Sequence, residues 1–248
     1  MLANKKVRAV NINFNKLYLS KAKSAARKLS RIGSVLLVGV SGSLARGSAE
    51  ESSDIDLFVV SRAGRIFTTR FLSKMILGRS ARRNRDKKPA GKICLNYFLS
   101  EESLDFKPHN DYVVEDYKNA IILFTKGDII DRLIKANKWL NPRFKLHKII
   151  CHSREGGNPL INRVDSRLRG NDTDKNGSDK RPLRNYKGEI RGDKGGTGSP
   201  YSLGNLLESA LRHLQVRKIK RDPRTQKYPQ KIVFSDLELR FHPPKGED

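Results

Sequence analysis

Two aspartates separated by a single residue, Asp54 and Asp56, stand at the start of an apolar run that continues to Val60. The side chains of a strand alternate between its two faces, so both carboxylates are expected on the same face. Neighbouring carboxylates repel each other, and a divalent cation is the usual remedy. Mg²⁺, or Mn²⁺ in its place, suits such a pair because it takes hard oxygen ligands and completes its octahedron with substrate phosphates. The spacing therefore predicts a metal site at Asp54 and Asp56.

A glycine-containing turn precedes the aspartates. The run Val35–Val40 is continuously apolar, as expected for a buried strand, and the polar residues Ser41, Gly42 and Ser43 follow it. Because Gly42 lacks a side chain, backbone N–H groups and the Ser43 hydroxyl can approach a phosphate closely. This segment predicts an anion-binding turn beside the cation site.

The pattern Gly42-Ser43, ten residues, Asp54-x-Asp56 resembles the signature of the DNA polymerase beta superfamily of nucleotidyltransferases. Residues 45–47 and 53–57 are similar especially to its small, minimal nucleotidyltransferase branch. The resemblance implies a Mg²⁺-dependent enzyme that transfers a nucleoside monophosphate from an NTP to a hydroxyl acceptor and releases pyrophosphate. It also implies that both aspartates are catalytic metal ligands. The residues that would hold the nucleotide are Gly42, Ser43 and Ser53.

One position departs from the family pattern, which has a third carboxylate on a later strand. The predicted strand Lys92–Leu99 carries Asn96 there. An amide is a weak, neutral ligand and cannot act as a base. Either a neighbouring acid substitutes, or turnover is slow, or the protein is a nucleotide- or nucleic-acid-binding relative that no longer catalyses. The neighbouring acids are Glu101, Glu102 and Asp105.

The elements around the motif predict an α/β (α+β) fold, in which helices cover a small mixed sheet. Strands are expected at 35–40, 54–60 and 92–99. Helices are expected at 16–29, 66–77, 111–124 and 128–140, with a short strand at 121–125 as the alternative within the third. The segment 203–214 has one apolar face, which we expect to pack on the helical region directly before the insertion, at 111–150.

The chain is expected to divide into four segments. They are a nucleotidyltransferase domain at 1–110, a helical region at 111–150, a disordered insertion at 151–200, and a C-terminal helix with a basic tail at 201–248. Within the insertion, Ser153–Asn158 returns in altered form as Ser166–Asn171, which resembles the translated palindromic repeats of bacterial genomes. We interpret the insertion as a passenger, and a basic arm for nucleic acid is the alternative.

Composition limits the partners and the setting. The 248 residues include 51 Lys+Arg and 26 Asp+Glu, a net charge of +25 that favours polyanions such as nucleotides or nucleic acid. The hydroxyl acceptor can be a protein, an RNA or a small molecule. Two cysteines, Cys94 and Cys151, exclude a disulfide framework and indicate a reducing compartment. No apolar run approaches the roughly 20 residues of a membrane span, so a soluble cytoplasmic protein is expected.

Several other side chains have two interpretations. Arg46 can bind phosphate or pair with an acid such as Glu50, and the basic run 79–92 can guide a polyanionic acceptor or form a solvated linker. Trp139 is expected to anchor the helical layer. The histidines show no metal-ligand spacing and are expected to be structural or surface residues: His109, His147, His152, His213 and His242.

Overall fold

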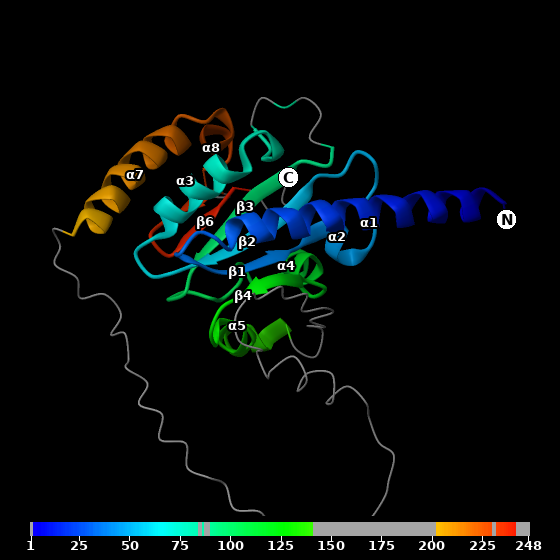
Figure 1. Cartoon of the computed structure of the whole chain (residues 1–248), viewed down its shortest axis with the longest axis horizontal. Coiled ribbons are helices and arrows are strands. Elements are labelled where there is room, and N and C mark those ends of the chain that lie inside the picture. Colours follow the sequence, from blue (N-terminus) through cyan, green and yellow to red (C-terminus); the bar gives the residue numbers. More distant parts are fainter. Residues whose placement is uncertain (1, 84–85, 87–89, 141–201, 230–231, 242–248) are drawn as a thin grey trace, which may run out of the picture. The chain divides into compact units, whose positions relative to one another are not determined.

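The computed structural model describes residues 2–83, 86, 90–140, 202–229 and 232–241, with the backbone alone for 2–13 and 224. Six strands form one sheet in the order β4-β1-β2-β3-β6-β5 (Figure 1). The strands are β1 Val35–Val40, β2 Ile55–Ser61, β3 Ile93–Ser100, β4 Ile121–Thr125, β5 Val233–Phe234 and β6 Glu238–Arg240. Of the neighbouring pairs, β2 and β3 are parallel and the others antiparallel, so the predicted mixed sheet is confirmed.

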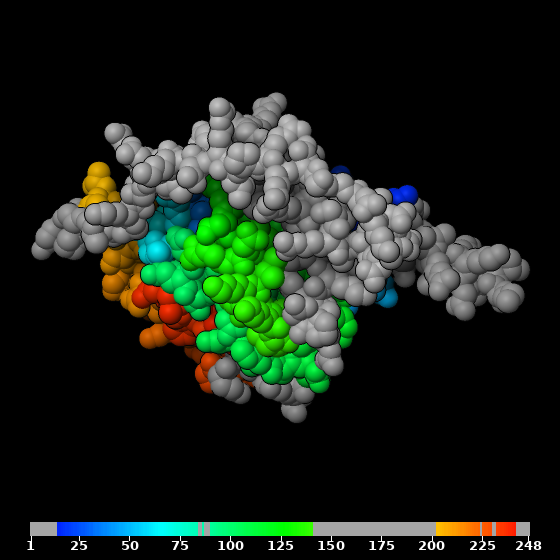
Figure 2. Space-filling view, turned by 90° about the horizontal axis from the view of Figure 1, so that it is seen from below, coloured from blue at the N-terminus to red at the C-terminus, as the bar shows by residue number. Residues whose placement is uncertain are grey.

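Helices cover both faces of this sheet (Figure 1). They are α1 Leu2–Leu29, α2 Gly42–Arg46, α3 Ile66–Leu77, α4 Asp111–Tyr117, α5 Ile129–Ala136, α7 Leu203–Lys220 and α8 Pro223–Lys227, with 3₁₀ turns at Gly78–Ser80 and Lys138–Leu140. A first core lies on the α1 and α3 face and contains Ala22, Leu29, Leu57 and Phe67. A second core lies on the α4 and α5 face and contains Phe58, Phe106, Tyr117 and Leu133. Figure 2 shows this second face, with α4, β4 and α5 in green and the C-terminal residues in red beside them.

The central strands are largely apolar because both of their faces are buried. Along β2, Leu57 and Val59 enter the first core, whereas Phe58 and Val60 enter the second. Gly39 of β1 makes room for a large neighbour, since a Cβ there would lie 2.2 Å from Phe58 Cζ. This alternation assigns Asp56, one residue before Leu57, to the same face as Phe58.

The structure changes two of the predicted helices. The first begins at Leu2 instead of residue 16. The helix expected at 111–124 ends at Tyr117, and 121–125 forms β4, which pairs with β1. Pairing overrides helical periodicity here because Ile122 enters the second core and Leu123 enters the first, which is the period-two pattern of a strand.

The packing partner predicted for the segment 203–214 is wrong. This segment belongs to α7, which among the described residues packs on α3 and not on α4 or α5 of the predicted helical region. The Glu208 carboxylate accepts hydrogen bonds from Phe67 N and Thr68 N, both at 2.8 Å, and Gln215 Nε2 donates to Phe67 O at 2.8 Å. These polar contacts select the partner, whereas an apolar stripe alone does not specify one. Much of the stripe is in fact exposed, namely Leu203, Leu206, Leu207 and Leu214.

Replacing Glu208 by alanine should lower the free energy of unfolding by about 1–2 kcal/mol, because two N–H groups at the start of α3 lose their acceptor. Glu208→Gln should recover part of the loss, since its amide oxygen still accepts. The matched control is Glu115→Ala, whose carboxylate pairs with Lys118 near the surface and should cost under about 0.5 kcal/mol. Urea denaturation measures all three variants, and equal effects of the two alanine variants would contradict the assignment.

Other sequence predictions fall outside the described residues. These include the whole of the insertion at 151–200, with Cys151, and the histidines at 147, 152 and 242. Among the helices that the structure does describe, none combines the length and the apolar character needed to cross a bilayer.

Candidate active site

The two aspartates meet a third side chain at the start of the parallel strand pair. Asp54 immediately precedes β2, and Asp56 lies opposite Cys94 in the β2–β3 register. One ligand atom from each of Asp54, Asp56 and Cys94 lies within 4.8 Å of the others. The convergence of the carboxylates expected from their spacing is therefore present, and Cys94 joins them from the neighbouring strand.

Gly42 packs directly against the Asp56 carboxylate. Its φ is +68°, and a Cβ there would lie 2.8 Å from Asp56 Oδ2. Ser41 N donates to Asp56 O at 3.1 Å, which joins the end of β1 to the start of β2. A side chain at position 42 would be both strained and in collision with the carboxylate. The Gly42-Ser43 turn thus lies beside the aspartates, with Ser43 half-buried.

The loop that leads into β2 is held by α1. Tyr18 Oη donates to Glu51 O at 2.7 Å, and Asn15 Nδ2 donates to Gly47 O at 2.6 Å. Within the loop, the Ser53 hydroxyl accepts a hydrogen bond from Glu50 N at 3.0 Å. This bond gives Ser53 a role in shaping the approach to Asp54, and its contact with nucleotide stays a prediction.

Arg82 is a site residue that sequence reasoning missed. Its Nη1 donates to Asp54 Oδ2 at 2.5 Å, and both side chains are only partly exposed. Arg82 N also donates to Ile93 O at 2.7 Å, which fixes this segment along the edge of β3. Arg82 therefore neutralises Asp54 from within the protein. A solvated linker therefore does not describe this residue, and no spacing in the basic run 79–92 distinguishes it from its neighbours.

Asn96 faces the site, as its strand position predicted. The β2–β3 register shifts after Leu57, which pairs with Leu95, so that Phe58 pairs with Tyr97 and Asn96 is left over. Asn96 Nδ2 donates to Asp56 Oδ1 at 3.0 Å, while Asn96 Oδ1 is buried without a hydrogen-bond partner. An amide thus orients one carboxylate and leaves an acceptor oxygen available. Cys94 shares this face, two residues earlier, a position that strand alternation would have flagged.

The acids considered as substitutes lie elsewhere. Glu101 pairs with Arg132 at 3.1 Å, the Glu102 carboxylate accepts from Ser100 Oγ, and Asp105 binds His109 and Trp139. The Trp139 bond agrees with its predicted anchoring role. None of these acids joins the cluster.

A different acid, Asp116 of α4, shares a small cavity of about 50 Å³ with Asp56 and Asn96. Arg46 pairs with Asp116 at 2.9 Å, not with Glu50. The third carboxylate near Asp56 therefore comes from a helix, which the strand pattern could not predict.

The protein environment opposes a negative charge on Asp56. Burial, and then the nearby charges of Asp54 and Asp116, raise the pKa of Asp56 to about 7, although Arg82 acts in the opposite direction. Burial also raises the pKa of the Cys94 thiol, which hydrogen-bonds to Asp56. At neutral pH the site therefore contains an excess of acidic groups that a bound cation would relieve.

The donor set fits a hard divalent cation. Thiolate, not thiol, is the metal-binding form of cysteine, and the raised pKa keeps Cys94 protonated. The remaining donors are oxygens: the carboxylates of Asp54 and Asp56, together with the unpartnered Asn96 Oδ1. An all-oxygen set suits Mg²⁺ or Mn²⁺ better than zinc. Metal bound at Asp54 would share this carboxylate with Arg82 or displace it.

The fold and the site define a class of protein. Residues 19–140 match the family model described as nucleotidyltransferase domain, a range that includes Gly42, both aspartates and Asn96. This part of the chain belongs to the nucleotidyltransferase family, in agreement with the resemblance to the polymerase beta superfamily, and the domain supports nucleotidyl transfer in general. Comparison with curated proteins and with solved structures found no match.

Replacing Asn96 by aspartate should strengthen binding of Mn²⁺ on the order of tenfold, because a charged ligand joins the site. Without metal the variant should lose about 1–3 kcal/mol of stability, since the hydrogen bond to Asp56 becomes a repulsion. The control is Asn110→Asp, at an N-cap position that accepts either residue. Thermal unfolding during Mn²⁺ titration measures both effects, and identical curves for wild type and Asn96→Asp would exclude Asn96 from the site.

Proposed function

We propose that this protein is a Mg²⁺-dependent nucleotidyltransferase that transfers a nucleoside monophosphate from an NTP to a hydroxyl acceptor, with release of pyrophosphate. The observation that carries the proposal is the packing of the Asp54–Asp56 pair against the Gly42 turn within a nucleotidyltransferase domain. A glycine turn that accepts phosphate and a carboxylate pair that accepts a cation are the two components that phosphoryl chemistry needs.

Each residue has a defined part in this proposal. Gly42 and Ser43 bind the triphosphate through backbone N–H groups and the Ser43 hydroxyl, and Ser53 supports the nucleotide from the adjacent loop. Asp54 and Asp56 hold the divalent cation, and Asn96 orients Asp56 because its Nδ2 donates to Asp56 Oδ1. When bound, the cation supplies charge neutralisation and alignment of the reacting oxygens.

In the reaction, the acceptor oxygen bonds to the α-phosphorus, the bond from the α-phosphorus to the bridging oxygen breaks, and pyrophosphate leaves. The amide of Asn96 cannot take up the acceptor's proton, so this proton passes to water. The absence of a carboxylate at this position predicts slow turnover. We further propose a cytoplasmic setting, since the buried Cys94 is a thiol outside any disulfide.

Labelled nucleotides test this function. The full chain is incubated with each NTP labelled at the α-phosphate, with Mg²⁺ or with chelator, and with fractionated cell lysate as the source of acceptors. We expect Mg²⁺-dependent transfer of label and equimolar pyrophosphate. A γ-labelled NTP should leave the acceptor unlabelled, and transfer of the γ-label instead would contradict nucleotidyl transfer.

A second candidate function is nucleotide or nucleic-acid binding without turnover. It is favoured by the Arg82–Asp54 ion pair and by the uncharged side chains Cys94 and Asn96 beside Asp56. The net charge of +25 suits a polyanionic ligand in either case. Binding of NTP that stabilises the fold without any pyrophosphate release would favour this candidate.

A further inference from the structure

A second, larger cavity lies between α3, α7 and the edge of β3. Its volume is about 470 Å³, enough for a small molecule or one nucleotide-sized group. It opens at this edge because β6 pairs with Tyr97, Phe98 and Leu99 but not with the earlier residues of β3. One wall is apolar and includes Leu211, Leu214, Ile219 and Phe241.

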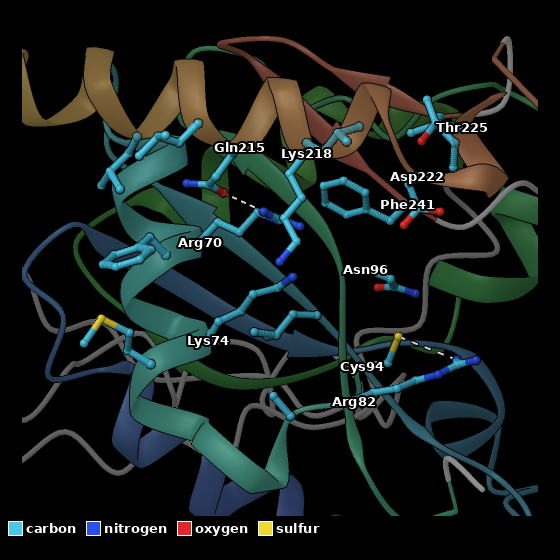
Figure 3. A pocket seen from close by; sticks show the side chains of 18 residues that line it. Arg70, Lys74, Arg82, Cys94, Asn96, Gln215, Lys218, Asp222, Thr225 and Phe241 are labelled. Atoms are coloured by element: carbon cyan, nitrogen blue, oxygen red, sulfur yellow. Dashed lines mark hydrogen bonds between the residues drawn. The ribbon is translucent and has the colours of Figure 1, made fainter. Parts of the chain in front are cut away.

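Basic side chains line the same cavity. Arg70 and Lys74 come from α3, Lys218 comes from α7, and their charged ends extend into the same space in Figure 3. Asp222 is the acidic residue among those that line the cavity. The balance of the lining is therefore positive, beside a largely apolar surface.

Among these residues, Arg70 gives the strongest evidence for an anionic ligand. Its Nη1 donates to the neutral Gln215 Oε1 at 2.5 Å, and its guanidinium lies 4.3 Å from the centroid of the Phe241 ring. Its Nε is buried without a hydrogen-bond partner. Burial lowers the pKa of Arg70 to about 10, with no neighbouring carboxylate to offset the effect. A buried cation of this kind is costly unless an anion accompanies it.

The cavity and the Gly42 turn lie on different sides of one carboxylate. Gly42 packs against Asp56 Oδ2, whereas Asn96, which lines the cavity, binds Asp56 Oδ1. Arg82 and Cys94 line the cavity as well. In phosphoryl transfer the entering and leaving oxygens lie roughly in line on opposite sides of phosphorus. With the triphosphate at Gly42, an acceptor would approach from the side of Asn96.

We propose that this cavity binds the acceptor, and that the acceptor carries a phosphate group held by Arg70 and Lys218 and an apolar group packed against Phe241 and Leu211. The role of the bound molecule as acceptor rests on the proposed function. The binding site itself is inferred from the lining of the cavity alone. A phosphate is favoured over a single carboxylate because several cations share one space and because arginine binds phosphate through paired N–H groups.

The test measures binding of two probes to the full chain by calorimetry, in buffer without metal or NTP. Inorganic phosphate supplies the anion alone, and phenyl phosphate adds an apolar ring. We expect phenyl phosphate to bind about tenfold more tightly, from burial of the ring. Lys218→Gln should weaken both probes by about tenfold, and Arg70→Gln by at least as much. Lys220→Gln removes the same charge from the same helix outside this cavity and should change either Kd less than twofold.

Three results would overturn the inference: no binding of either probe, unchanged Kd values in Lys218→Gln, or an equal loss in Lys220→Gln. Because Lys218 is exposed, its variant keeps the test valid even if Arg70→Gln does not fold. The outcome is separate from that of the nucleotidyl transfer assay. A chain that transfers label but does not bind phenyl phosphate would overturn this inference alone, and one that binds without transfer would overturn the proposed function alone.

Discussion

Replacing Asp54 or Asp56 by alanine will reduce Mg²⁺-dependent nucleotidyl transfer by about 10³-fold or more, the range for single charged groups that act on a transferring phosphoryl group. Each change removes one of two carboxylates that share a site with few other oxygen donors. The measurement is single-turnover transfer of an α-labelled NTP. Asp236→Ala is the matched control, because Asp236 pairs with Arg212 on the surface and should leave the rate unchanged. Wild-type rates in either site variant would refute the assignment.

The same two variants should differ in metal-free stability. Asp54→Ala leaves Arg82 without its ion-pair partner and should lower the melting temperature. Asp56→Ala removes a carboxylate that burial and neighbouring acids disfavour, and should raise it. A general loss of folding would lower the melting temperature of both variants, so it does not explain shifts in opposite directions. Shifts in the same direction would show that the contacts of Arg82 and Asn96 are assigned incorrectly.

Asp56 should also make metal-free stability depend on pH. Its pKa is about 7 in the folded protein against an ordinary value of 3.8. Between these values the folded state binds more protons than the unfolded state, so stability falls as pH rises through this window. Below pH 4 the penalty is absent, and above about pH 7 it is complete, on the order of a few kcal/mol. The Asp56→Asn variant should lack this pH-dependent loss of stability.

Urea denaturation of wild type and Asp56→Asn at pH values from 4 to 8 measures the effect as the difference between the two proteins, which cancels other titrations. The difference should grow with pH and level off near pH 8. Asp236→Asn, at an exposed position, serves as the control and should follow wild type throughout. A constant difference between wild type and Asp56→Asn would mean that Asp56 is ionised normally. Metal should reduce the difference, because only the ionised carboxylate is a good ligand.

Local pattern was sufficient for the centre of the fold and for the carboxylate pair. The runs 35–40 and 66–77 became β1 and α3 with the same bounds, since continuous apolar character and helical periodicity were unambiguous there. The convergence of Asp54 and Asp56 follows from strand alternation alone. These features depend on residues close together in the chain.

Features that depend on distant pairing could not be predicted. The ion pair of Arg82 with Asp54 spans 28 residues. The sequence of the basic run does not distinguish the arginine that forms this pair from the other arginines. The docking of α7 on α3 rests on Glu208 and Gln215, which bond to residues 140 and 148 positions away. The strands β5 and β6 have two and three residues, too few to show a period. The pairing of β6 with β3 ends at Tyr97, and the cavity beside Asn96 lies where it ends.

A crystal of the full chain grown with Mn²⁺ and a non-hydrolysable NTP analogue is the most direct test of the proposed metal and nucleotide sites, because manganese is located by its anomalous scattering. We expect an anomalous peak for manganese between the carboxylates of Asp54 and Asp56, and the triphosphate against Gly42 and Ser43. Arg82 should have shifted away from Asp54 Oδ2. A peak away from both aspartates, or a nucleotide bound elsewhere with the Arg82–Asp54 pair intact, would contradict the proposed sites.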